Sequence, residues 1–175
     1  AAGAGGRRCS CGAWGRGFVA GARMLLEGSA REGGLAREVA KAAQTRSGDP
    51  LDDNSQMGPL ATEAQLNNVR STLADATANG ASVRYGGNTP KGLETGWYIA
   101  PTIVDGPHQN ISIVPKELFG PVVSALGFHD ETEALALAND TNFGLASGIF
   151  TRDVGRALRI SKAIRAGIVW VNTYR

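Results

Sequence analysis

The stretch ELFGP at residues 117–121, followed by the apolar run VVSAL at 122–126, decides the fold. Gly-Pro marks a sharp turn, and the apolar run predicts a buried strand over 121–128. The turn therefore places the Glu117 carboxylate and the Phe119 ring at a strand entrance, where both can face a ligand. A carboxylate can accept two hydroxyl hydrogen bonds from a ribose, and an aromatic face can pack on a planar ring. The alternative interpretation is a surface turn with a core phenylalanine.

Downstream of this strand, apolar segments alternate with helix signals. Strands are predicted at 146–150 and 167–172. One helix, after the strand at 121–128, begins in the acidic segment DETE at 130–133 and runs through Ala138. Another, after the strand at 146–150, has Asp153 as its N-cap and ends near Ile164. This alternation is typical of a parallel sheet covered on both faces. We therefore predict an α/β fold: a three-layer parallel sheet, containing all three strands, with helices on both faces.

The upstream half carries weaker signals of the same kind. A strand is predicted at 22–27 and a helix at 29–44. The segment TEAQ at 62–65 is a capping box, and the apolar residues after it recur on one helical face until Asn79-Gly80, which can end a helix in a left-handed cap. Short strands are predicted at 83–85 and 102–104.

Composition limits the class of protein. The chain has 175 residues, 42% of them apolar and 19% charged, which suits one globular domain with a core. No apolar run is long enough to cross a bilayer, so no membrane partner is predicted. The net charge is only +2 and its basic excess lies in residues 1–46, which argues against nucleic acid. With only two cysteines and no signal-peptide layout, a cytoplasmic location is expected.

Several further segments, taken in their order, carry a family resemblance. They are GDPLD at 48–52, QMGPL at 56–60, ANDTNFGLASGIFTRD at 138–153 and AGIVWVNT at 166–173. Together with ELFGP they closely resemble the catalytic domain of the NAD(P)-dependent aldehyde dehydrogenase superfamily. The resemblance runs from about Val19 to the last residue. It predicts a partial catalytic domain over 18–175, truncated at both ends, after an irregular Gly/Arg-rich lead over 1–17.

The resemblance implies an activity and a set of site residues. Members of the family oxidise an aldehyde to a carboxylic acid with NAD or NADP, through a cysteine thioester. By the resemblance, Glu117 would hold the nicotinamide ribose and Phe119 would pack against the cofactor. Asn172 and Thr173 fall at the carboxyl end of a strand, near where substrate lies in the family. A small aldehyde substrate and a homo-oligomer are also implied.

The nucleophile position departs from the family pattern. The family cysteine lies in a Gly-Gln-x-Cys segment shortly before Ala-Gly-x-Arg, whereas this chain has GRGFVAGAR at 15–23. Phe18 therefore occupies the cysteine position, and phenylalanine has no lone pair that can attack a carbonyl. Cys9 and Cys11 are substitutes only through a displaced loop, because neither has the matching offset. Residues 1–17 also lack any Glu, Asp or Asn that could serve as general base or oxyanion donor.

Two hypotheses remain open. The chain is the catalytic-domain portion of an aldehyde dehydrogenase, inactive alone, or it is a non-catalytic module that retains the fold. The composition of residues 1–17 also fits translation outside the family's reading frame.

Cys9-Ser10-Cys11 supplies fewer than the four ligands of a usual metal site, so no metal is predicted.

Overall fold

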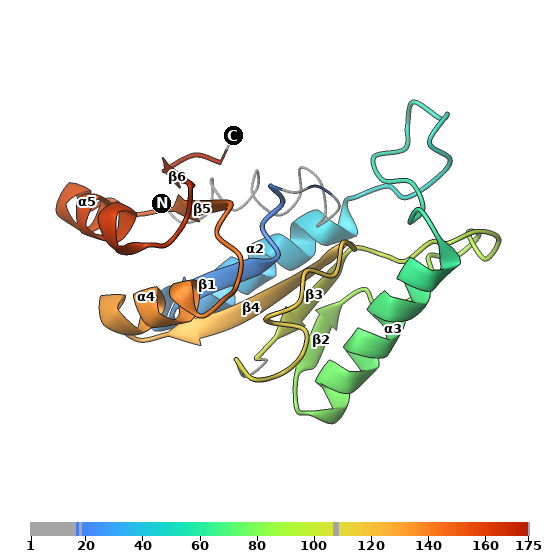
Figure 1. The fold of residues 1–175 in the computed structure, drawn as a ribbon. Coiled ribbons are helices and arrows are strands. Elements are labelled where there is room, and N and C mark those ends of the chain that lie inside the picture. Colours follow the sequence, from blue (N-terminus) through green and yellow to red (C-terminus); the bar gives the residue numbers. More distant parts are fainter. Residues whose placement is uncertain (1–16, 18, 107–108, 175) are drawn as a thin grey trace.

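Two separate sheets organise the computed structural model, which describes residues 17, 19–106 and 109–174. The larger sheet has the order β1 (Arg23–Glu27), β4 (Val122–Phe128), β3 (Thr102–Asp105), β2 (Ser82–Tyr85) (Figure 1). In it, β1 and β3 both run parallel to β4, whereas β2 runs antiparallel to β3. The smaller sheet is a parallel pair of β5 (Ala146–Ile149) and β6 (Ile168–Val171).

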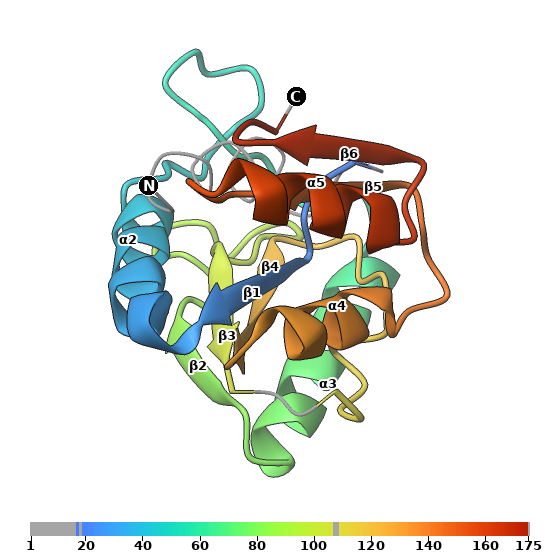
Figure 2. The ribbon, with the colours of Figure 1, turned by 90° about the vertical axis from the view of Figure 1, so that its left-hand side faces the viewer.

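Helices cover both faces of the larger sheet. Figure 2 shows α2 (Arg31–Ala43) and α3 (Glu63–Ala78) on opposite sides of its strands, and the short helix η1 (Gly28–Ala30) leads into α2. Alternate strand residues point to opposite faces. Ile103, Val123 and Ala125 belong to the apolar cluster beneath α2. The cluster beneath α3 contains Val104, Val122 and Leu126, with Leu66, Val69 and Leu73 from the helix. The predicted α/β class, with a parallel sheet between helices, is therefore confirmed.

The predicted helix starts are also confirmed, because each cap residue makes its hydrogen bond. Thr62 Oγ1 accepts from the Gln65 N–H at 3.2 Å. Asp130 caps α4 (Glu131–Asn139) by accepting from the Glu133 N–H at 2.9 Å. Asp153 caps α5 (Val154–Ala163) in the same way, at 3.0 Å. These bonds satisfy backbone donors that have no partner inside the helix.

The prediction that the strands near 121–128, 146–150 and 167–172 share one sheet is wrong. All three strands exist, but β5 and β6 pair only with each other. Neither strand can pair with β4, because β1 and β3 occupy its two edges, and neither pairs with β1, the edge strand of the larger sheet. The smaller sheet is also more exposed than a buried parallel sheet, since Ile168 and Val171 of β6 are 46% and 41% exposed.

Arg23 connects the larger sheet to α4. Its guanidinium donates to the carbonyls of Leu137 and Ala138, both at 3.0 Å, and more weakly to that of Asp140 at 3.5 Å. These carbonyls lie at the C-terminal end of α4, where helix carbonyls have no partner within the helix and carry partial negative charge. Burial lowers the pKa of Arg23, and the nearby Asp140 carboxylate opposes that effect.

Two further side chains donate to the same end of α4. We call the carbonyls of residues 137–140, together with the groups that donate to them, the α4 carbonyl cluster. Gln109, in the loop after β3, donates to the Asp140 carbonyl at 2.9 Å. Arg165, between α5 and β6, donates from its side chain to the Asn139 carbonyl at 2.5 Å and from its backbone to Asn139 Oδ1 at 2.8 Å. The cluster thus joins β1, the loop after β3 and the segment before β6.

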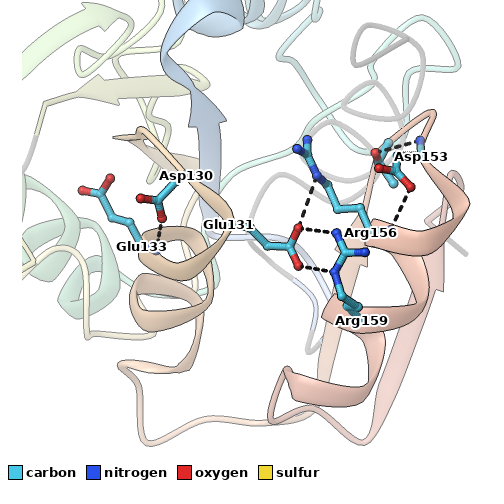
Figure 3. A network of polar contacts seen from close by, with 7 residues as sticks. Asp130, Glu131, Glu133, Asp153, Arg156 and Arg159 are labelled. Carbon is cyan, nitrogen blue, oxygen red and sulfur yellow. Dashed lines mark hydrogen bonds and ion pairs between the residues drawn. The ribbon is translucent and has the colours of Figure 1, made fainter.

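A carboxylate–guanidinium network also joins α4 to α5 (Figure 3). Glu131 accepts from Arg159 through Nε at 3.0 Å and through an Nη at 2.9 Å, and Arg156 Nε lies 3.4 Å from the same carboxylate. Two parallel bonds to one carboxylate fix the orientation of the guanidinium.

Among the described residues, no helix is long and apolar enough to cross a membrane.

We predict that Arg23→Ala lowers the free energy of unfolding by about 2–3 kcal/mol, the scale of hydrogen bonds that involve a charged group. The substitution leaves the carbonyls of Leu137 and Ala138 without their donor. Urea denaturation followed by circular dichroism measures the change. Arg37→Ala, at an exposed position of α2, is the matched control. An equal, small effect of both substitutions would contradict the assignment.

We predict that the effect of Glu131→Gln on thermal stability depends on pH. The hydrogen bond from Arg159 lowers the pKa of Glu131 below its usual value. The stabilisation is therefore fully present above the unfolded pKa, about 4.3, and disappears as pH falls through the lower folded value. The difference in Tm between the two proteins should accordingly be larger at neutral pH than well below pH 4. Glu27→Gln, at an exposed carboxylate on β1, is the matched control.

Candidate functional site

The predicted ligand-facing turn lies directly before β4. Glu117 is exposed and Phe119 half-buried, while Leu118 and Gly120 are buried. The turn leads straight into the sheet, because the Thr102 N–H donates to the Pro121 carbonyl at 2.7 Å. The carboxylate therefore projects from a fixed strand entrance, as the sequence predicts, and Phe119 has part of its surface accessible.

Phe119 has an unusual backbone conformation. Its φ of 52° lies in the left-handed region, which costs a residue with a side chain roughly 1–2 kcal/mol. Packing against α3 compensates. Leu118 belongs to the apolar cluster with Val69 of α3, and a Cβ on Gly120 would lie 2.6 Å from Val69 Cγ2. The close approach of the two segments therefore requires glycine at 120.

Asn172 and Thr173 directly follow β6, as predicted, and both are exposed. Asn172 has φ 55°, a conformation that asparagine tolerates better than most residues. Its N–H donates to the Ile149 carbonyl at 2.8 Å, and its Oδ1 accepts from the Thr151 N–H at 2.9 Å. Asn172 thus links the ends of β5 and β6. Its side-chain oxygen is engaged in this link, which leaves Nδ2 as the atom able to donate to a ligand.

The segment entering β1 lies beside the first part of β4 in the fold. The Ser124 N–H donates to the Ala22 carbonyl at 2.9 Å, so the chain before β1 runs next to the start of β4. Figures 1 and 2 place the amino ends of β1 and β4 on the same side of the molecule as the carboxyl end of β6.

Three predicted positions lie outside the described residues: Phe18, Cys9 and Cys11. Within the described residues, no group of three or more His, Cys, Asp or Glu side chains is placed to hold a metal ion. The role of Arg23 is not predictable from the sequence, although Arg23 belongs to the Ala-Gly-x-Arg segment of the family pattern. Nothing in the sequence signals that this arginine binds the end of a helix more than a hundred residues away.

Comparison with known proteins agrees with this arrangement. The model of the aldehyde dehydrogenase family matches residues 7–175. The chain belongs to the aldehyde dehydrogenase family. Betaine aldehyde dehydrogenase of Brucella anthropi is 43% identical over 156 residues, a match that covers 88% of this chain and 32% of that protein. The chain thus spans about a third of the length of the family members it resembles.

Solved family structures share the fold. Betaine aldehyde dehydrogenase of Staphylococcus aureus, in complex with NAD+, superposes with a TM-score of 0.92 at 31% identity, over 97% of this chain and 34% of that one. An aldehyde dehydrogenase described as putative, from Burkholderia cenocepacia, gives a TM-score of 0.93 at 38% identity, over 98% and 35% of the two chains. The fold of this chain therefore matches about a third of each of these longer proteins.

We predict that Gly120→Ala lowers the free energy of unfolding by about 1–3 kcal/mol, the usual cost of overpacking a core. The added methyl group would meet the buried Val69 side chain at 2.6 Å. In a Val69→Ala background the same substitution should cost clearly less, because the clashing group is gone. Equal costs in the two backgrounds, measured by urea denaturation, would show that the contact does not determine the residue at 120.

Proposed function

We propose that this chain is the part of an NAD-dependent aldehyde dehydrogenase that orients the nicotinamide half of the cofactor, and that it does not oxidise aldehydes by itself. The observation that carries the proposal is the exposed Glu117 carboxylate on the α3-packed turn at the entrance of β4. When bound, NAD would accept the hydride from the substrate. This chain's contribution is to bind and orient.

Glu117 supplies the binding group in this proposal. A carboxylate accepts hydrogen bonds from the two adjacent hydroxyls of a ribose. Phe119 provides a partly accessible ring for packing against the cofactor. NADP would present the same nicotinamide ribose, so these two residues suit either cofactor.

Asn172 and Thr173 are proposed to contact the aldehyde substrate. Both are exposed at the end of β6, on the same side of the fold as the segment entering β1. The support is this placement together with the Asn172 conformation, which is fixed by the bonds to Ile149 and Thr151. Betaine aldehyde is the substrate in the names of several relatives, and a small aldehyde is the substrate class proposed here.

The sequence supports the proposed inactivity of the chain alone. Phe18 stands at the nucleophile position, and covalent catalysis requires a thiolate within reach of the carbonyl. Phe18 also supports the second candidate function, a non-catalytic module that retains the fold.

A cytoplasmic, homo-oligomeric enzyme is proposed for the whole protein. Exposed apolar side chains on α5 and β6 support an interface there, among them Val154 at 73% and Leu158 at 58% exposure.

We predict that Glu117→Gln weakens cofactor binding or hydride transfer. The test uses a chimeric enzyme, defined as a complete family member whose matching segment is replaced by residues 58–128 of this chain. The loss should reach roughly 10- to 100-fold in kcat/KM for NAD, equivalent to about 1.5–3 kcal/mol for a charged hydrogen bond. Glu63→Gln, an exposed carboxylate on α3, is the control. Unchanged kinetics with every aldehyde tested would remove Glu117 from the site.

We predict that the purified 175-residue chain produces no reduced cofactor from NAD or NADP with aliphatic, aromatic or semialdehyde substrates. The reason is the absence of a thiolate at position 18. Absorbance of the reduced cofactor measures turnover, and an enzyme-free mixture is the control. Turnover above that control, abolished by Cys9→Ser or Cys11→Ser, would overturn the prediction and establish a displaced nucleophile.

A further inference from the structure

Gln65 makes an unexpected pair of contacts with the ligand-facing turn. Its side-chain amide Nε2 donates to the carbonyl of Leu118, at 3.4 Å, and to the carbonyl of Phe119 at a shorter distance. These two carbonyls belong to the peptides on either side of the left-handed Phe119. One amide group thus binds both carbonyls of the turn at its most strained point.

Gln65 lies at a position of α3 where the side chain usually makes a local contact. Gln65 is the third helical residue after the Thr62 cap, and its backbone N–H donates to Thr62 Oγ1. In a capping box the side chain at this position reaches back to the N–H of the cap residue. Here the side chain instead crosses to the turn, 53 and 54 residues away in sequence. The backbone of Gln65 therefore starts the helix, while its side chain holds another segment.

The rest of the turn follows the same surface of α3. Leu118 packs in the cluster that contains Leu66 and Val69, and Gly120 lies against the Val69 side chain. Val69 is the i+4 neighbour of Gln65 and the i+3 neighbour of Leu66 on the helix surface. The first turns of α3 therefore act as a rigid template for residues 118–120, and the exposed Glu117 is fixed to the start of that segment.

We propose that Gln65 is a positioning residue that fixes the direction of the Glu117 carboxylate toward the nicotinamide ribose. The inference rests on the proposed role of Glu117. Gln65 itself acts through the backbone of Leu118 and Phe119. Its amide supplies two N–H donors, whereas a glutamate of the same size supplies none when ionised. Gln65→Glu therefore removes the contacts and preserves the side-chain volume.

The first experiment tests the positioning in the 175-residue chain itself. Hydrogen exchange of the backbone amides is compared between the parent chain, Gln65→Glu and Asn67→Asp. Asn67 lies on the same helix, is exposed, and undergoes the same amide-to-carboxylate change. Gln65→Glu should speed exchange at Phe119 and Val122 by about tenfold or more, because the turn opens locally. Core amides such as Val104 should not change, and neither should any amide in Asn67→Asp.

A neutral variant keeps this test decisive. Gln65→Met removes the donors without adding charge, so it should accelerate exchange in the turn as Gln65→Glu does. Circular dichroism verifies that α3 is retained, as expected since glutamate at this position also suits a capping box. Unaltered exchange at Phe119 and Val122 in both variants would overturn the positioning role, whatever the function of Glu117.

The second experiment measures coupling in the chimeric enzyme. Gln65→Glu should raise KM for NAD or lower kcat in the same sense as Glu117→Gln, and the double variant should be no worse than Glu117→Gln alone. Non-additivity of this kind is expected when one residue acts through the other. If Glu117→Gln has no effect, the proposed function fails. The inference about Gln65 fails in two other cases, both with Glu117→Gln impairing the enzyme. In one, Gln65→Glu has no effect. In the other, the losses of the two single variants add fully in the double variant.

Discussion

The attraction between the carbonyl end of α4 and the side chains that bind it holds the two sheets together. Arg23 comes from the larger sheet and Arg165 from the segment that leads into the smaller one. Both donate to the same helix end, where unpaired carbonyls carry partial negative charge. The bidentate pairing of Glu131 with Arg159 adds a second polar link, between α4 and α5. The orientation of β6 relative to β1, and with it the geometry of the candidate site, depends on these directional contacts.

Local patterns in the sequence predicted the elements of this fold well. The caps at Thr62, Asp130 and Asp153 act within four residues of themselves, so their meaning is readable without knowledge of the fold. Gly80 has φ 91°, as expected for the left-handed end of α3. The turn before β4 was likewise located from Gly-Pro alone.

Long-range pairing could not be predicted from the same signals. The apolar run of β6 suits a buried central strand equally well, and no local signal indicates that it pairs with β5 alone and not with a strand of the larger sheet. Gln65 presents the same difficulty on a smaller scale. Its place in a capping box predicts a local contact, yet its amide binds carbonyls 53 and 54 residues away. No sequence signal indicates the left-handed φ of Phe119 either, because a left-handed conformation is expected at the neighbouring Gly120.

The division into two sheets has a consequence for how the chain unfolds. Among the described residues, both large apolar clusters lie in the part built from α2, α3 and the larger sheet, and neither includes a residue of α4, β5, α5 or β6. Burial of apolar surface is the main source of cooperativity, whereas the links across the boundary are polar and directional. We therefore expect the segment from α4 to β6 to open as a separate cooperative unit before the larger sheet melts. A single unfolding midpoint would then describe an average of two transitions.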